Sequence, residues 1–160
     1  MKLAQPWGGS NGHGDSAKNR YNDTKGKSME FEFVVPKRPV SFQTDNKDNL
    51  RVWKDYVYGY AFRAWKGSPI VNEYFRFSIV FLCEEEPPDI NNIIKPIEDV
   101  LCGLVYPDDS SVISVDGHTR FFSEPFDITI APEKLVEAFY LGNECVYVRV
   151  KTIRHEELFI

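Results

Sequence analysis

Side chains suited to phosphoryl chemistry are concentrated between Asp89 and Asp109. Asn91 stands two residues after Asp89, and Lys95 follows it at a four-residue step. Hydrolysis of a phosphodiester requires an activated water and neutralisation of the extra negative charge on the phosphoryl group, and bound Mg²⁺ can provide both. Mg²⁺ takes oxygen ligands, usually one or two carboxylates with waters and substrate phosphate. Asp89 and Asp109 are therefore the best carboxylate candidates for a metal site.

The elements on either side of Asp89 are predicted from composition and spacing. Residues 74–83 are rich in aromatic and β-branched side chains, which favours a central strand. Residues 94–104 show helical spacing of apolar side chains. Pro96 fits without penalty only in the first turn of that helix. Asp89 and Asn91 are then expected in the strand-to-helix turn, where backbone N–H groups and the helix dipole favour anions.

The remaining elements indicate an α+β fold, a small mixed β-sheet packed against two or three helices. Apolar spacing predicts further strands at 29–36, 111–122 and 144–153, an extended piece at 126–130, and helices at 46–65 and 132–141. Strand order does not follow from the sequence. Residues 1–28 have almost no apolar periodicity, so we expect a flexible leader followed by a single domain over 29–160.

Composition limits the classes of function. The net charge of −5 argues against a protein that coats nucleic acid by charge alone, although residues 1–28 carry five Lys or Arg against two Asp. Neither an apolar stretch of about 20 residues nor a signal-peptide pattern is present, which predicts a cytoplasmic protein without a membrane span. The three cysteines lack metal-ligand spacing and are expected to be reduced and buried.

The sequence PDINNIIKPIED at 88–99, followed by the Asp108–Asp109 pair, resembles the RusA family of Holliday junction resolvases. That family's pattern is Asp-x-Asp-Asn, Lys three residues on, Asp four further, and an Asp-Asp pair after a short loop. The resemblance extends upstream to residues 35–43 and the helix that contains Trp53. It covers roughly residues 30 to 122.

The resemblance implies a RusA-like fold and a homodimer that cuts branched DNA, a four-way junction, with Mg²⁺ or Mn²⁺. It implies that Asp89, Asn91 and Asp109 bind the metal and that Lys95 assists catalysis. An alternative for Lys95 is a surface pair with Asp99, four residues on.

Five further residues are expected to support this chemistry. Asp99 would hold the side chain of Lys95, and Asn92 would lie beside the metal ligands. Asp108 could contribute a ligand or only cap its loop, and the loop role is favoured. Lys37 and Arg38, in the family-like entry segment, are candidates for contact with DNA phosphate. His118 and Arg120 could approach DNA, but a polar pair on a strand explains them equally.

Asn91 departs from the family pattern, which has aspartate at this position. An amide oxygen is a weaker ligand for Mg²⁺ than a carboxylate. The chain is then a naturally weakened or inactive relative, an engineered Asp-to-Asn form, or an enzyme in which a nearby carboxylate compensates. Glu84, Glu85 and Glu86 are favoured as a solvated acidic turn after a strand, and one of them is the alternative candidate for that carboxylate. Two other functions remain open: a catalytically silent junction-binding protein, favoured by Asn91, and a protein-interaction module, favoured by the net charge of −5.

Overall fold

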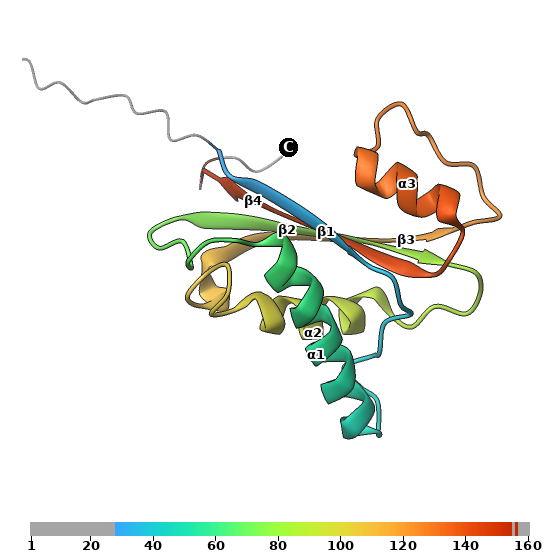
Figure 1. Ribbon diagram of the computed structural model, residues 1–160, viewed down its shortest axis with the longest axis horizontal. Coiled ribbons are helices and arrows are strands. Elements are labelled where there is room, and N and C mark those ends of the chain that lie inside the picture. Colours follow the sequence, from blue (N-terminus) through green and yellow to red (C-terminus); the bar gives the residue numbers. More distant parts are fainter. Residues whose placement is uncertain (1–27, 155, 157–160) are drawn as a thin grey trace, which may run out of the picture.

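The computed structural model describes residues 28–154 and residue 156. The predicted leader lies outside the described residues apart from Ser28. The elements follow one another as β1 (Glu30–Val35), α1 (Lys47–Ala64), β2 (Tyr74–Cys83), α2 (Ile90–Leu101), the 3₁₀ helix η1 (Asp109–Ser111), β3 (Val112–Phe121), α3 (Glu133–Leu141) and β4 (Cys145–Ile153) (Figure 1).

The four strands form one sheet in the order β1-β4-β2-β3. β2 and β3 are parallel and are joined through α2, while β4 runs antiparallel to both β1 and β2. Helices α1 and α2 cover one face of the sheet and α3 covers part of the other (Figure 1). This arrangement confirms the predicted α+β class with a small mixed sheet.

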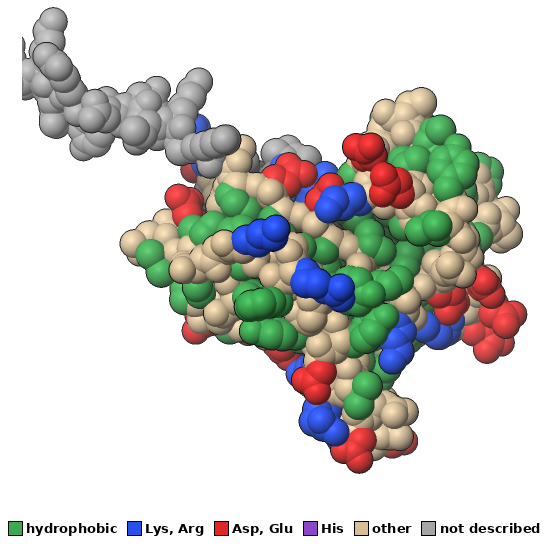
Figure 2. Space-filling model, in the orientation of Figure 1, with side chains coloured by type: hydrophobic (Ala, Val, Ile, Leu, Met, Phe, Trp, Pro, Cys, Tyr) green, Lys and Arg blue, Asp and Glu red, His purple; other side chains and the backbone are tan. Residues whose placement is uncertain are grey.

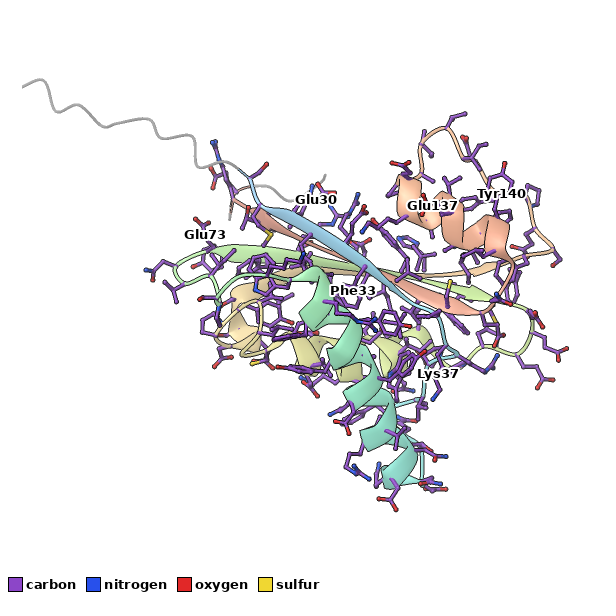
Figure 3. The ribbon with its side chains drawn as sticks, in the orientation of Figure 1. Glu30, Phe33, Lys37, Glu73, Glu137 and Tyr140 are labelled. Carbon is purple, nitrogen blue, oxygen red and sulfur yellow. The ribbon has the colours of Figure 1, made fainter. Side chains whose placement is uncertain are left out.

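The main core lies between the sheet and helices α1 and α2. Alternate strand residues point into it, among them Phe33 of β1, which faces α1 (Figure 3), and the fully buried Phe77 of β2. Trp53 and Val57 of α1 are fully buried on the opposite side. Alternation along the strands and the three- and four-residue steps along α1 therefore predict which side chains form this core.

The start of α2 differs from the prediction. The helix begins at Ile90, so Pro96 lies inside it rather than in its first turn. A proline at this position leaves the carbonyl four residues earlier, that of Asn92, without its helical donor. The backbone N–H of Phe42 donates to that oxygen at 2.9 Å. A segment distant in sequence thus satisfies the carbonyl that Pro96 leaves open.

Two smaller predictions were also wrong. Residues 126–130 form no strand, because Asp127 Oδ1 accepts hydrogen bonds from the backbone N–H and hydroxyl of Thr129, at 2.9 and 2.6 Å, and closes a turn. Cys102 is exposed at the end of α2, whereas Cys83 and Cys145 are buried as expected. In the part of the chain that the structure describes, no helix has the length and apolar character needed to cross a membrane.

Candidate active site

Asp89 is the N-cap residue of α2. Its Oδ1 accepts a hydrogen bond from the backbone N–H of Asn91 at 2.9 Å, and its backbone carbonyl accepts from the N–H of Asn92 at 3.0 Å. An aspartate cap satisfies N–H groups that have no partner within the helix and suits the positive end of the helix dipole. Asp89 is therefore held by local geometry, while Asn91 and Asn92 lie in the first turn of α2 rather than before it.

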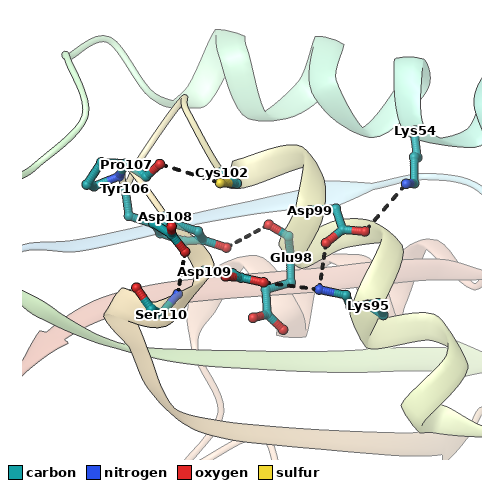
Figure 4. A network of polar contacts seen from close by, with 10 residues as sticks. All are labelled: Lys54, Lys95, Glu98, Asp99, Cys102, Tyr106, Pro107, Asp108, Asp109 and Ser110. Atoms are coloured by element: carbon teal, nitrogen blue, oxygen red, sulfur yellow. Dashed lines mark hydrogen bonds and ion pairs between the residues drawn. The ribbon is translucent and has the colours of Figure 1, made fainter.

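Asn91, Lys95 and Asp99 follow one another at four-residue steps and form one stripe along α2. The ammonium of Lys95 lies 2.8 Å from Asp99 Oδ1 and 3.3 Å from Asp109 Oδ2 (Figure 4). The structure thus brings the lysine of the helix to the Asp pair that follows it. Hydrogen bonds to Asp99 and Asp109 raise the pKa of Lys95 above its ordinary value, against the opposing effect of burial.

The Asp pair begins the 3₁₀ helix η1. Asp108 is its N-cap and accepts a hydrogen bond from the backbone N–H of Ser110 at 2.9 Å, which lowers the pKa of the Asp108 carboxyl. Asp109 is the first residue of η1, and its side chain is half exposed. The two neighbouring carboxylates therefore have different surroundings: Asp108 closes the turn and Asp109 faces Lys95.

The loop between α2 and η1 is tied back to the helix. The hydroxyl of Tyr106, a fully buried residue, donates to the backbone carbonyl of Glu98 at 2.7 Å. The N–H of Gly103 donates to the carbonyl of Tyr106 at 2.7 Å, and Gly103 has a φ of +84°, which glycine adopts without strain. These contacts place Asp109 against α2 rather than leaving it on a free loop.

The close approach of α2 to β3 depends on Gly117. A Cβ atom at this position would lie 2.9 Å from Ile90 Cγ1 and 2.9 Å from Ile94 Cδ1. Both isoleucines flank the turn of α2 that carries Asn91, and Ile94 precedes Lys95 directly. The absence of a side chain at Gly117 therefore sets how deeply this half of α2 sits on the sheet.

The donors predicted for a metal are all oxygen atoms, the carboxylates of Asp89 and Asp109 and the amide of Asn91. This set suits Mg²⁺ in chemical kind, since Mg²⁺ is usually held by one or two carboxylates and keeps several waters. Within the described residues, however, no three His, Cys, Asp or Glu side chains are grouped around one cation position. The contacts bring Asp109 to Lys95, while the capping contact of Asp89 is with its own helix.

Arg38 is engaged within the protein. Its guanidinium donates to Glu144 Oε1 at 2.7 Å and to the backbone carbonyls of Glu85 and Glu86 at 3.2 and 2.5 Å. Glu86 has a φ of +43°, an unfavourable conformation for this residue type that Arg38 helps to hold. Glu144, which the sequence reasoning did not single out, also accepts from the backbone N–H of Glu84.

The acidic run is a turn tied down through its backbone. Among the described residues, the hydrogen bonds of Glu84, Glu85 and Glu86 use main-chain atoms, and all three residues are exposed. In the described contacts, none of the three carboxylates is paired with Asn91 or with Lys95. Lys37, by contrast, holds its ammonium over the ring of Tyr56, 5.1 Å from the ring centroid.

His118 joins a cluster centred on Asp116. His118 Nε2 lies 3.3 Å from Asp116 Oδ2, while Arg76 Nε and Ser78 Oγ donate to Asp116 Oδ1 at 2.7 and 2.8 Å. Burial alone would raise the pKa of Asp116, but the contacts with Arg76 and Ser78 outweigh it and lower the pKa.

This cluster lies on the other face of the sheet from the site. Gly117, between the two clustered residues of β3, faces α2, so Asp116 and His118 face away from it. Arg120 contacts the carbonyl of Thr119 at 2.8 Å.

Sequence reasoning missed Lys54 of α1, whose ammonium lies 3.5 Å from Asp99 Oδ2 (Figure 4). The only local signal is its position next to the core residue Trp53, which places it at the border of the buried face of α1. Nothing in the periodicity of α1 indicates which element lies opposite that border.

A comparison with models of protein families gave a match that covers most of these elements. The family model described as "Endodeoxyribonuclease RusA" matches residues 17–131, a span that includes β1, α1, β2, α2, η1 and β3. The comparison with curated proteins gave no match.

Proposed function

The chain belongs to the RusA endodeoxyribonuclease family, and from this premise we propose that it cuts phosphodiesters in four-way DNA junctions with Mg²⁺, or Mn²⁺ in its place. The observation that carries the proposal is the contact of Lys95 with Asp109 at 3.3 Å. This contact brings the lysine of the helical part of the motif to the Asp-Asp pair that ends the motif. The two residues are fourteen positions apart in the sequence and meet on the exposed surface.

In this proposal Asp89, Asn91 and Asp109 would hold the metal. Bound Mg²⁺ would supply an activated water and neutralise charge on the phosphoryl group. Lys95 would place a protonated ammonium beside the reacting phosphate, where it stabilises the negative charge that develops in the transition state. Asp99 would keep that ammonium in place from one turn further along α2.

In this proposal the protein binds DNA through a few local Lys and Arg contacts rather than through a strongly basic surface. Figure 2 shows Lys and Arg side chains interspersed with Asp and Glu over the face that carries α1. Lys37 remains a candidate for phosphate contact, and so does Arg38, whose side chain is 41% exposed while it pairs with Glu144. A homodimer would supply the two sites, related by a twofold axis, that symmetric incision of a junction requires.

A catalytically silent junction-binding protein is the second candidate, and Asn91 is the observation that favours it. Asn91 is exposed and lies one turn before Lys95 on the same stripe of α2. An aspartate there would add a charged ligand in the first turn, while the amide keeps the shape and loses the charge. Metal binding would be weakened more than the fold.

The test is cleavage of a labelled four-way junction by the chain and by its Asn91→Asp variant in Mg²⁺ and in Mn²⁺, with junction binding followed in Ca²⁺. Asn49→Asp is the matched control, because it makes the same charge change at an exposed position in the first turn of α1, outside the proposed site. Cleavage by the chain itself supports an active enzyme. Cleavage by the Asn91→Asp variant alone, with binding by both, supports the silent binder; neither binding nor cleavage in any form would refute both and favour a protein-interaction module.

A further inference from the structure

The carboxylate of Asp99 is shared between two helices. Its Oδ1 lies 2.8 Å from the ammonium of Lys95 on α2, and its Oδ2 lies 3.5 Å from the ammonium of Lys54 on α1. Lys95 in turn reaches Asp109 at 3.3 Å. Charges of alternating sign therefore run from α1 across α2 to η1 (Figure 4).

We propose that Lys54 is a positioning residue that acts through Asp99 to set where the ammonium of Lys95 lies relative to Asp109. The inference rests on the proposed function, because it assigns Lys54 a part in the same reaction. Lys54 itself touches Asp99, and the described contacts do not bring it to Asp109.

The geometry of the carboxylate provides the mechanism. With one oxygen turned to Lys54, Asp99 offers the other to Lys95, whose ammonium then lies between Asp99 and Asp109. Without Lys54, the carboxylate is free to rotate and to offer both oxygens to Lys95, four residues away on the same helix. The ammonium would then be drawn toward Asp99 and away from Asp109.

The burial of α1 makes Lys54 suited to this role. Its neighbour Trp53 and the residue one turn on, Val57, are both fully buried, so the backbone that carries Lys54 is held against the core. The side chain of Lys54 is 33% exposed, compared with 68% for Arg51 on the same helix. Among the residues that the structure describes, Arg51 pairs with Asp55 of its own helix at 3.6 Å and with no residue of α2 or η1, so it provides a matched control.

The test compares Lys54→Met, Lys54→Arg and Arg51→Met, each in the chain and in its Asn91→Asp form. Two quantities are measured: kcat and KM for junction cleavage in Mg²⁺, and the ¹⁵N resonance of the Lys95 side-chain nitrogen in lysine-labelled protein without metal. We expect Lys54→Met to lower kcat about three- to tenfold with KM unchanged. It should also shift the Lys95 resonance. Lys54→Arg should restore most of the rate, and Arg51→Met should change neither quantity.

The outcomes separate this inference from the proposed function. An unchanged kcat in a form that cuts, or an unmoved Lys95 resonance, would overturn the role of Lys54. An effect of Lys54→Met that persists in full after Asp99→Asn would also overturn it, because the action is through Asp99. If no form cuts a junction, the proposed function fails, while a shifted Lys95 resonance still supports the link through Asp99.

Discussion

Replacing Gly117 with alanine should push α2 away from β3. The added Cβ would lie 2.9 Å from both Ile90 Cγ1 and Ile94 Cδ1, about 0.6 Å closer than an ordinary carbon–carbon contact. Overpacking of this kind costs about 1–3 kcal/mol. Alanine also lowers the conformational entropy of the unfolded chain, which offsets about 0.4–1 kcal/mol of this destabilisation. The difference between these ranges is about 0–2.6 kcal/mol; from its middle we expect the free energy of unfolding to fall by about 1–2 kcal/mol, and Tm by roughly 2–8 °C.

Urea and thermal unfolding measure this effect, and two further variants test its cause. Gly59→Ala, inside α1, places the new Cβ more than 4 Å from every described atom beyond its own stretch of helix, and should instead stabilise the protein by about 0.5–1 kcal/mol. Ile94→Val removes one of the two clashing atoms, so the double variant with Gly117→Ala should be more stable than the sum of the single changes by about 0.5 kcal/mol or more. A neutral Gly117→Ala, or strict additivity with Ile94→Val, would refute the packing argument.

The other predictions concern Arg38, Lys37 and Cys145. Arg38→Met should lower the free energy of unfolding by about 1–2 kcal/mol, because the Glu144 carboxylate and the backbone carbonyls of Glu85 and Glu86 lose the hydrogen bonds that the guanidinium donates. The salt dependence of junction binding should stay unchanged in Arg38→Met if Arg38 does not contact DNA. If Lys37 contacts one phosphate, Lys37→Met should reduce the slope of log K for junction binding against log salt concentration by about 0.9. Burial raises the pKa of Cys145 from 9.0 to about 11, so the unfolded thiol ionises first and the free energy of unfolding should fall as pH rises across that interval. Urea unfolding at a series of pH values should show a smaller fall in Cys145→Ala, with Cys102→Ala as the control; an identical fall in both variants would contradict this assignment.

Much of the fold was predictable because its signals are local. Alternation in residues 30–35 and the apolar spacing of residues 47–64 report which side of each element is buried, without reference to the rest of the chain. Strand order was not predictable, since the pairing of β4 between β1 and β2 joins segments more than 60 residues apart. The start of α2 was missed for a related reason: Pro96 is tolerated inside the helix because Phe42, from another segment, binds the open carbonyl.

The same distinction between local and long-range information applies to the candidate site. The sequence determined the residue types and their order, and its helical spacing determined that Lys95 and Asp99 share one face of α2. Only the tertiary structure decided that Lys95 meets Asp109, that Lys54 meets Asp99, and that Arg38 holds the acidic turn. These contacts join separate elements, and their distances depend on how α1, α2 and η1 pack together. Spacing along one chain carries information about neighbours on one helix, whereas the partner across a packing interface is set by the whole fold.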